Sequence, residues 1–421
     1  MARHRTHRPR SRGFTLTELM VAVVGGLIVA MAMFALARDS SRFYQRETRV
    51  GDATMGALVA FQRLSLDIQR AGYMASPNFD RDPRICRPPV GAGALPNVGA
   101  LRIQPTGGLP GVFTDARNGV TPETIDILGN FGRPERFLIW GVESAGAGFV
   151  VHLQEHGPLK RLGYTALGAP EKNDLLTSLF PQRRLLRIVD LAGRHYYGII
   201  QQAADTGGDP AITLAATPGI VMKLAGGQDC GVNQLSIGTA NVVNIIRYEL
   251  RPIANVAAEA PGYAPLYPAN PTELGKFDVA TRTELVRYEL EADGVTPRNE
   301  TMEVVAEYGV DLRFGVTAIT GRQIGLEITP AGLTSGAMGA TGAWTGPLPA
   351  ARPDQIRTVR ARLSVRSEMP DRYGPTPPDP ALAPGLYRFF VGSWGTRDLY
   401  ARVRTIQADI GLRNLEPILW P

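Results

Sequence analysis

One short stretch of the sequence carries side chains that could hold a zinc ion. Residues 152–156 read HLQEH, and in the pattern H-x-x-E-H two histidines bind zinc while the glutamate activates a water molecule. That chemistry needs the three side chains on consecutive turns of a helix, together with a third protein ligand. Here GFVV precedes the stretch and GP follows it, so we predict a strand that enters a turn. A strand would place His152 and His156 about 13 Å apart, too far to share one zinc ion.

The other candidates for chemistry are weaker. Residues 205–209 read DTGGD, a polar turn that offers fewer oxygen ligands than the roughly six to eight that calcium takes. His195 stands beside two tyrosines with no nearby acid or nucleophile, so we expect a structural role. The sequence contains no nucleophile elbow, phosphate-binding loop, dinucleotide fingerprint or paired-cysteine zinc pattern. We therefore predict no catalytic residue, metal or cofactor, with a membrane-anchored periplasmic enzyme as an alternative.

Cys86 and Cys230 are the two cysteines of the chain. In an oxidising compartment they can form a single disulfide. Closing so long a loop would stabilise the fold by roughly 4 kcal/mol in the entropic description of such bonds. We predict the disulfide on condition that this part of the chain is exported, and two buried free thiols are the alternative.

The apolar run at residues 19–37 contains no charged residue. At about 1.5 Å per residue, a helix over residues 14–37 is roughly as long as a bilayer core is thick. Arginines stand at positions 3, 5, 8, 10 and 12, and no acid occurs among residues 1–13. Because cationic flanks stay on the cytoplasmic side, we expect a single transmembrane helix with the rest of the chain on the outer side.

The net charge of +6 and the pI near 9.4 do not indicate a nucleic-acid partner. Five of the 45 basic residues are the arginines of residues 1–13, which leaves 40 basic residues against 39 acidic ones. A nearly neutral chain has no electrostatic means of binding a polyanion.

No proline occurs between Pro9 and Pro77, which predicts one long helix over about residues 14–71. In residues 38–71 apolar side chains recur every three or four positions, as expected of an amphipathic helix, and Asp67 falls on a polar face. Gly72 is the expected stop. The residues of the apolar stripe are Phe43, Val50, Thr54, Ala57, Phe61, Leu64, Ile68 and Ala71.

Residues 72–421 predict a β-rich unit, because short apolar runs alternate with proline and glycine. The clearest strand is 358–366, where apolar residues alternate with Ser364 and arginines, including Arg366, on a cationic outer face. Long surface loops are expected at 252–277, 329–353 and 370–384. The predicted strands are 101–104, 124–128, 137–140, 149–154, 185–190, 196–201, 211–214, 242–250, 284–290, 302–306, 311–316, 358–366 and 400–405. The fold class is α+β, with the distal half of the helix packed on an antiparallel sheet.

The N-terminal stretch RGFTLTE, residues 12–18, resembles the class III signal of type IV pilins and type II secretion pseudopilins. The resemblance rests on a basic leader, residues 1–13, that ends in Gly13, on the following Phe14, and on Glu18 as fifth residue of the mature chain. It implies that a prepilin peptidase cuts between Gly13 and Phe14 and methylates the new N-terminus. It also implies that Glu18 pairs with the Phe14 amine of a neighbouring subunit during assembly. Thr17 departs from the family, which usually has an apolar residue there.

The free energy needed to place the Glu18 carboxylate at membrane depth also favours a partner for it. A carboxylate at mid-bilayer costs about 2.5–3.5 kcal/mol, less near the interface, and normally has a partner. Two alternatives remain for residues 1–37. One is a plain membrane anchor with an interfacial acid, and the other is a secretory signal peptide cleaved after the ALA of residues 35–37.

Within this group the chain looks most like the PilW-type minor pilins. The matching words are QRAGY at 69–73, IRTVR at 356–360 with VRS at 365–367, and GLRN at 411–414. The resemblance implies a minor pilin that primes assembly at the filament tip, resident first in the inner membrane with a periplasmic C-terminus and then in the pilus at the cell surface. Implied partners are other minor and major pilins, the prepilin peptidase, the inner-membrane assembly machinery and, before assembly, bilayer lipid. A minor pseudopilin of a type II secretion system is the alternative.

Overall fold

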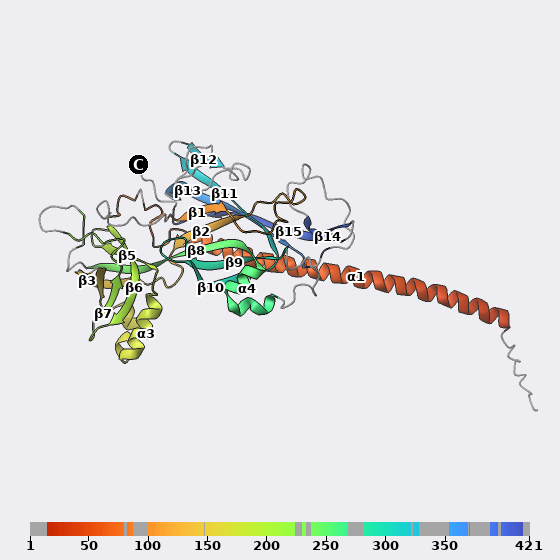
Figure 1. Cartoon of the computed structure of the whole chain (residues 1–421), viewed down its shortest axis with the longest axis horizontal. Helices are drawn as coiled ribbons and strands as arrows, with labels where there is room; N and C mark the ends of the chain where they lie inside the picture. Colours follow the sequence, from red (N-terminus) through yellow and green to blue (C-terminus); the bar gives the residue numbers. More distant parts are fainter. Residues whose placement is uncertain are drawn as a thin grey trace, which may run out of the picture. The chain divides into compact units, whose positions relative to one another are not determined.

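The computed structural model describes residues 15–79, 82–86, 99–146, 148–223, 230–232, 237–267, 281–320, 323–327, 353–368, 370, 388–394 and 397–415. The chain divides into two compact units, Met1–Asp52 and Ala53–Pro421. The first unit holds the N-terminal part of a long helix, and the second holds an antiparallel β-rich fold (Figure 1). The predicted α+β class is confirmed at this level.

Helix α1 (Leu16–Gln69) is continuous over 54 residues. Its bounds agree with the predicted helix at 14–71 to within two residues. The absence of proline explains the continuity, because an interior proline would remove a backbone hydrogen bond and clash with the preceding turn. The helix contributes residues to both units.

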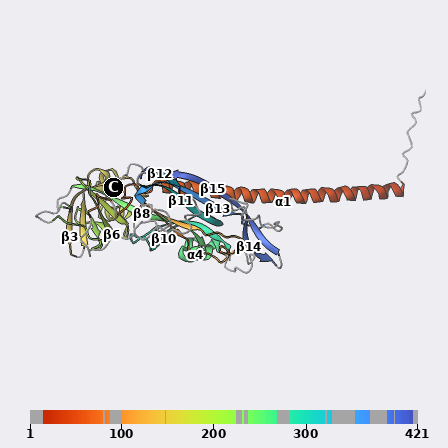
Figure 2. The same ribbon diagram turned by 90° about the horizontal axis from the view of Figure 1, so that it is seen from above.

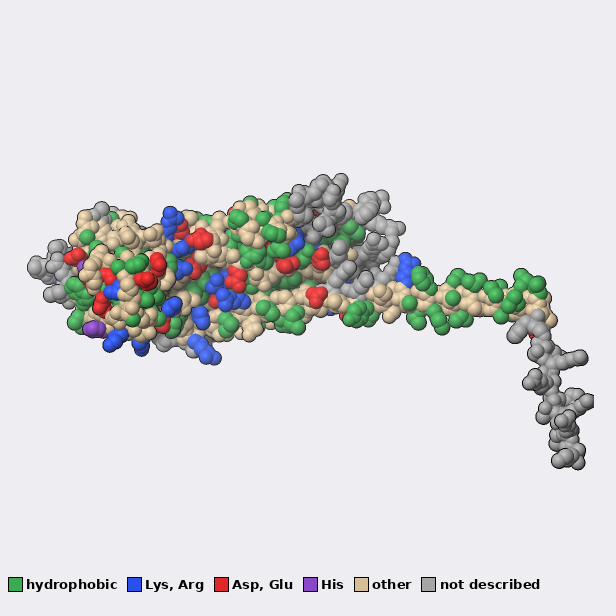
Figure 3. Space-filling view, turned by 90° about the horizontal axis from the view of Figure 1, so that it is seen from below, with side chains coloured by type: hydrophobic (Ala, Val, Ile, Leu, Met, Phe, Trp, Pro, Cys, Tyr) green, Lys and Arg blue, Asp and Glu red, His purple; other side chains and the backbone are tan. Residues whose placement is uncertain are grey.

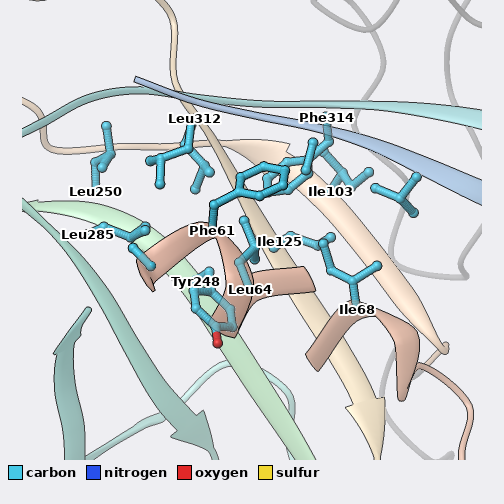
Figure 4. Close-up of a cluster of buried hydrophobic side chains, with 14 of the residues drawn as sticks. Phe61, Leu64, Ile68, Ile103, Ile125, Tyr248, Leu250, Leu285, Leu312 and Phe314 are labelled. Atoms are coloured by element: carbon cyan, nitrogen blue, oxygen red, sulfur yellow. The ribbon is translucent and has the colours of Figure 1, made fainter. Parts of the chain in front are cut away.

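In the second unit, α1 buries one face in the largest hydrophobic cluster. Figure 4 shows Phe61, Leu64 and Ile68 of the helix pointing at strand residues such as Ile125 and Phe314. The predicted apolar stripe is therefore confirmed from Ala57 onward. Full burial of each large side chain stabilises the fold by about 1.5–3 kcal/mol, so this face fixes the helix to the sheets.

Part of the large sheet closes on itself. Its strands follow the neighbour order β8-β3-β4-β7-β6-β5, and β5 pairs in turn with β8, so the hydrogen bonds form a ring with every pair antiparallel. Such closure leaves no free strand edge. Helix α3 (Ala169–Leu179) packs on this barrel and places Leu176 and Leu179 in its core. The barrel strands are β3 (Phe137–Ala145), β4 (Gly148–Leu153), β5 (Leu185–Asp190), β6 (His195–Asp205), β7 (Pro210–Leu214) and β8 (Gly238–Pro252).

Strand β8 continues from the barrel into the open part of the same sheet. Beyond the barrel it pairs with β2 along one edge and with β9 along the other. Figures 1 and 2 show the barrel strands grouped apart from the strands of the second sheet. The remaining strands of the open part are β1 (Leu101–Pro105), β2 (Glu123–Gly129), β9 (Thr283–Leu290) and β10 (Pro297–Ala306).

The second sheet has the order β12-β11-β13-β15-β14, with the predicted strand 358–366 at its centre as β13. The inward alternation of that strand is confirmed, but its outer face is not wholly cationic. Arg366 is buried, donates to the carbonyl oxygens of Ser367 and Glu368, and lies 4.7 Å from the ring centroid of Tyr308. The strands are β11 (Gly309–Thr320), β12 (Gln323–Glu327), β13 (Ile356–Arg366), β14 (Arg388–Trp394) and β15 (Arg397–Gly411).

One predicted loop is wrong. Residues 252–277 begin with helix α4 (Ile253–Glu259) and the 3-10 helix η2 (Pro261–Leu266). The α4 sequence IANVAAE is rich in the good helix former alanine, and the prolines flank it at positions 252 and 261. Ile253 and Val256 enter a hydrophobic cluster with β8 and β9, which fixes the helix to the sheet. The predicted loops at 329–353 and 370–384 lie almost entirely outside the described residues.

Two buried glutamates of the large sheet contact β11 or the residue just before it, and burial shifts the pKa of both. Glu123 on β2 accepts a hydrogen bond from the amide nitrogen of Phe314 at 2.7 Å. Glu284 on β9 accepts one from the amide nitrogen of Tyr308 at 3.1 Å. Burial raises the pKa of each carboxyl to about 7, although neighbouring arginines oppose the shift. The protonated form of each carboxyl is therefore favoured in the folded protein below about pH 7.

Stability should consequently fall as the pH rises. The pKa of each carboxyl in the folded protein exceeds the ordinary value of 4.5. The stability that comes from binding the proton in the folded state is therefore complete below pH 4.5 and is lost as the pH rises through 7. We expect the free energy of unfolding to decrease between about pH 5 and about pH 8, by up to about 3 kcal/mol per carboxyl. Urea unfolding should show a flatter pH profile for Glu123→Gln, while Glu171→Gln, at an exposed position on α3, keeps the original slope. An unchanged slope for Glu123→Gln would contradict this assignment.

Candidate functional site

The apolar part of α1 lies in the first unit and packs against no other residue of that unit that the structure describes. It runs from Leu16 to Ser41, 26 residues that are long and apolar enough to span a membrane. Every side chain described in this span is exposed, and Figure 3 shows hydrophobic side chains over its surface. At about 1.5 Å per residue the span exceeds the roughly 30 Å of a hydrocarbon core. The chain therefore carries an N-terminal helix suited to a membrane.

Glu18 caps the start of this helix together with Thr15. The Glu18 carboxylate accepts hydrogen bonds from the Thr15 amide nitrogen at 3.0 Å and from the Thr15 hydroxyl at 2.9 Å. In return, the Glu18 amide nitrogen donates to the Thr15 hydroxyl at 3.3 Å. This reciprocal pattern is a capping box, and the sequence TLTE at 15–18 carries its signature. The prediction from the sequence was an intersubunit partner for Glu18, the Phe14 amine of a neighbouring subunit, and Thr15 was not predicted. Gly13 and Phe14 lie outside the described residues.

The structure joins Cys86 and Cys230 in a disulfide, with their Cα atoms 5.7 Å apart. The bond sits beside the barrel, where Cys86 is buried in the core cluster and Cys230 packs against it. The Cys86 amide nitrogen also donates to the carbonyl oxygen of His195 on β6 at 3.1 Å. The disulfide therefore fastens the segment that follows α1 to the barrel across 144 residues of chain.

His195 belongs to a buried polar cluster with Ser76 and Asp82. These residue types occur in serine hydrolases, but their arrangement here differs. The Ser76 hydroxyl donates to Asp82 Oδ2 at 2.6 Å, while His195 Nδ1 lies 3.5 Å from the same oxygen. A base must instead contact the hydroxyl that it activates. All three side chains are buried, and Asp82 is an acid near His195 that the neighbouring sequence does not contain; the structural role of His195 stays a prediction.

The HLQEH stretch has the predicted strand-and-turn conformation. His152 lies on β4, whereas His156 is exposed in the turn that precedes the short helix α2 (Pro158–Arg161). The ring of His152 contacts Asp209 through Nδ1 at 2.6 Å and Glu143 through Nε2 at 3.3 Å. Among the described residues, no group of three or more His, Cys, Asp or Glu side chains is arranged to hold a metal ion.

The DTGGD turn connects β6 to β7, and its first carboxylate already has protein partners. Asp205 accepts hydrogen bonds from the Tyr164 hydroxyl at 2.8 Å and from the Gly208 amide nitrogen at 2.6 Å. Lys172 on α3 places Nζ 3.2 Å from the same carboxylate. This lysine already occupies the Asp205 carboxylate that a calcium ion would need as a ligand.

The segments QRAGY (69–73) and GLRN (411–414) contact each other in the structure, although Gln69 and Asn414 are 345 residues apart in the sequence. Asn414 Nδ2 donates to the carbonyl oxygens of Gln69 at 3.0 Å and Ala71 at 3.4 Å, which satisfies acceptors left free at the end of α1. Gly72 has a positive φ of 71°, and a Cβ there would come within 2.8 Å of the Leu415 side chain. Gly72 follows the end of the helix as predicted, and the position requires glycine for two reasons: its backbone is left-handed and the Leu415 side chain packs closely against it.

Asp67 anchors α1 to the sheet. The prediction that it lies on a polar face of the helix is wrong, because its side chain is almost wholly buried beside Ile68. The carboxylate accepts hydrogen bonds from the Tyr248 hydroxyl at 2.7 Å and from Arg287 Nε at 2.7 Å. Helical periodicity indicates which face a residue occupies but does not reveal polar partners on the facing strands.

The outer face of α1 in the second unit carries a second apolar stripe. Met55, Val59 and Leu66 recur at helical spacing and are all exposed, with Leu58 beside them. This outer stripe lies opposite the face that packs on the sheets. Exposed apolar rows of this kind indicate an interaction surface.

These features define an α+β protein whose N-terminal helix can span a membrane and whose antiparallel β-rich unit is fixed to the distal end of that helix. No family model matches the chain, and no curated protein or solved structure shows detectable similarity to it.

Proposed function

We propose that this protein is a minor pilin of a type IV pilus. A prepilin peptidase would cleave it between Gly13 and Phe14, and the helix would then carry it from the inner membrane into the filament. The observation that carries the proposal is the 26-residue apolar span with no buried side chain, which begins within the signal-like residues 12–18 and is capped by Glu18. Such a span packs against no other described residue of its unit, as a membrane-inserted segment destined for a filament requires.

Glu18 would have different partners before and after assembly. Within the single chain its carboxylate is satisfied by Thr15, which lowers the cost of holding it near the membrane interface. In the filament, the amine of a neighbouring Phe14 would carry a full positive charge, which attracts the carboxylate more strongly at short range than the neutral Thr15 donors do. The capping box thus keeps the carboxylate satisfied until the stronger partner arrives.

The outer stripe of α1 supports the same proposal. Its apolar side chains would pack against helices of neighbouring pilins, while the inner face remains attached to the sheets. Partners in this account are other minor and major pilins, the peptidase and the inner-membrane assembly machinery. Recovery of the protein in pili sheared from the cell surface tests this function directly. Its retention in the envelope of piliated cells would favour the pseudopilin of a type II secretion system instead.

We expect Glu18→Ala to separate processing from assembly. The variant should be cleaved normally, because alanine costs less than a carboxylate in lipid, but should enter filaments poorly because it cannot pair with the amine. The ratio of the variant in sheared pili to that in membranes should fall at least about tenfold. Thr17→Ile, which restores the usual apolar residue one position away, serves as the matched control and should assemble normally. Equal incorporation of Glu18→Ala and the control would remove the assembly role.

A further inference from the structure

The outer surface of the barrel carries a pocket that the proposed filament role does not use. Its volume is about 310 Å³, within the range of small-ligand sites. Trp140, Leu153 and Pro210 supply apolar walls, and Glu155 and Asp209 supply carboxylates. None of the lining residues in the described part of the chain is a lysine or an arginine.

Trp140 lies at a local irregularity of β3. The pairing with β4 shifts register between Ile139 and Gly141, so Trp140 is the extra residue of a bulge. Bulges are common beside binding sites. Trp140 is 40 % exposed between the buried residues Ile139 and Gly141, as the alternation of a strand predicts, so its side chain faces the solvent.

His152 fixes both the aromatic and the acidic walls. Its ring stacks beside Trp140 with 4.7 Å between centroids and an interplanar angle of 33°. Its nitrogens contact Asp209 at 2.6 Å and Glu143 at 3.3 Å, so the imidazole is held between two carboxylates. His152 is therefore a positioning residue for Trp140 and Asp209.

The charges around the pocket are mainly negative. Carboxylates of Glu143, Glu155, Asp205 and Asp209 gather there. The cation that faces them is Lys172, whose Nζ lies 3.2 Å from Asp205 and 3.9 Å from Glu155, with the His152 ring as a second potential cation. Glu155 and Asp209 therefore retain capacity for a further positive group.

We propose that this pocket binds an organic cation: an ammonium or guanidinium group, as carried by a basic side chain or a quaternary ammonium compound. The cation would lie against the exposed face of Trp140, which attracts positive charge through its ring quadrupole. Glu155 and Asp209 would contact it from the rim, and the apolar walls would cover its methyl groups or methylene stem. A neutral ligand of the same shape would forgo both electrostatic interactions.

The test uses the full-length protein in an uncharged detergent, with isotope-labelled tryptophan. The indole N–H signal that disappears in Trp140→Phe identifies the reporter. Tetramethylammonium, the amide of N-acetyl-lysine and the amide of N-acetyl-arginine are titrated separately, which distinguishes quaternary ammonium from primary ammonium and guanidinium ligands. Neopentyl alcohol serves as the neutral isostere of tetramethylammonium.

We expect a saturable shift of the Trp140 signal with at least one cation, at millimolar concentration, that weakens as sodium chloride is raised. Asp209→Asn and Glu155→Gln should each weaken binding by about fivefold or more. Asp174→Asn removes an exposed carboxylate on α3 outside the pocket and should leave the affinity unchanged. Equal binding of neopentyl alcohol, no saturable shift with any cation, or full affinity in both charge variants would each overturn the proposal.

Discussion

Replacing Gly13 with serine should leave the chain uncleaved and confined to the inner membrane. The expectation follows from the resemblance of residues 12–18 to a prepilin signal, in which the peptidase cuts directly after the glycine. A side chain at this position would obstruct the backbone at the cleavage site, since glycine alone offers an unhindered approach. An immunoblot of cell membranes should show a single band larger than the mature protein, and sheared pili should contain none of it.

The matched control keeps the charge of the leader and changes a neighbouring position. Arg12→Lys retains a cationic flank, so topology and cleavage should both persist. If Gly13→Ser were processed to the same size as the Arg12→Lys control, residues 12–18 would not form a prepilin signal. The apolar span would then act as a permanent anchor or as part of a different signal.

The second large effect concerns the attachment of α1 to the sheet. Asp67 is 3 % exposed and accepts hydrogen bonds from Tyr248 and Arg287. Burial and the neighbouring Asp67 charge raise the pKa of Tyr248 far above its usual range, so its hydroxyl remains a donor. Asp67→Ala would leave the guanidinium of Arg287 buried without its closest anion. We expect a loss of about 3–5 kcal/mol in the free energy of unfolding, measured by urea titration.

The surface ion pair between Arg63 of α1 and Glu303 of β10 provides the comparison for the loss of stability. Arg63 lies 3.7 Å from Glu303, and both side chains are about half exposed. Such pairs contribute less than about 1 kcal/mol, so Arg63→Ala should barely change stability. Asp67→Asn should fall between the two, because an amide still accepts a hydrogen bond but carries no charge. A loss for Asp67→Ala no greater than that for Arg63→Ala would show that Asp67 does not anchor the helix.

Local periodicity predicted most of the secondary structure. Every predicted strand overlaps an observed one, because period-two alternation is a property of consecutive residues. The helix at 14–71 was likewise evident from spacing and from the proline-free interval. The closure of the barrel by the pairing of β5 with β8 was not predictable, because the sequence of one strand does not indicate which distant strand it pairs with. Helix α4 was predicted as a loop because prolines flank it, although its own sequence IANVAAE favours a helix.

The candidate site was predictable to a similar extent. Glu18 and the cysteine pair stood out by residue type, and the TLTE signature of the capping box was present in the sequence but was not used. The cap that Asn414 places on α1 and the buried partners of Asp67 depend on residues far apart in the chain. Such contacts require the three-dimensional arrangement.

Mass spectrometry of the N-terminal peptide of the mature protein, purified from cells, tests the central claim most directly. The proposal predicts that the peptide begins at Phe14 and that its amine carries a methyl group. A peptide that begins at the initiator end would indicate an uncleaved anchor, and one that begins at Arg38 would indicate a secreted protein without the helix. Either result would contradict assembly through the N-terminal helix.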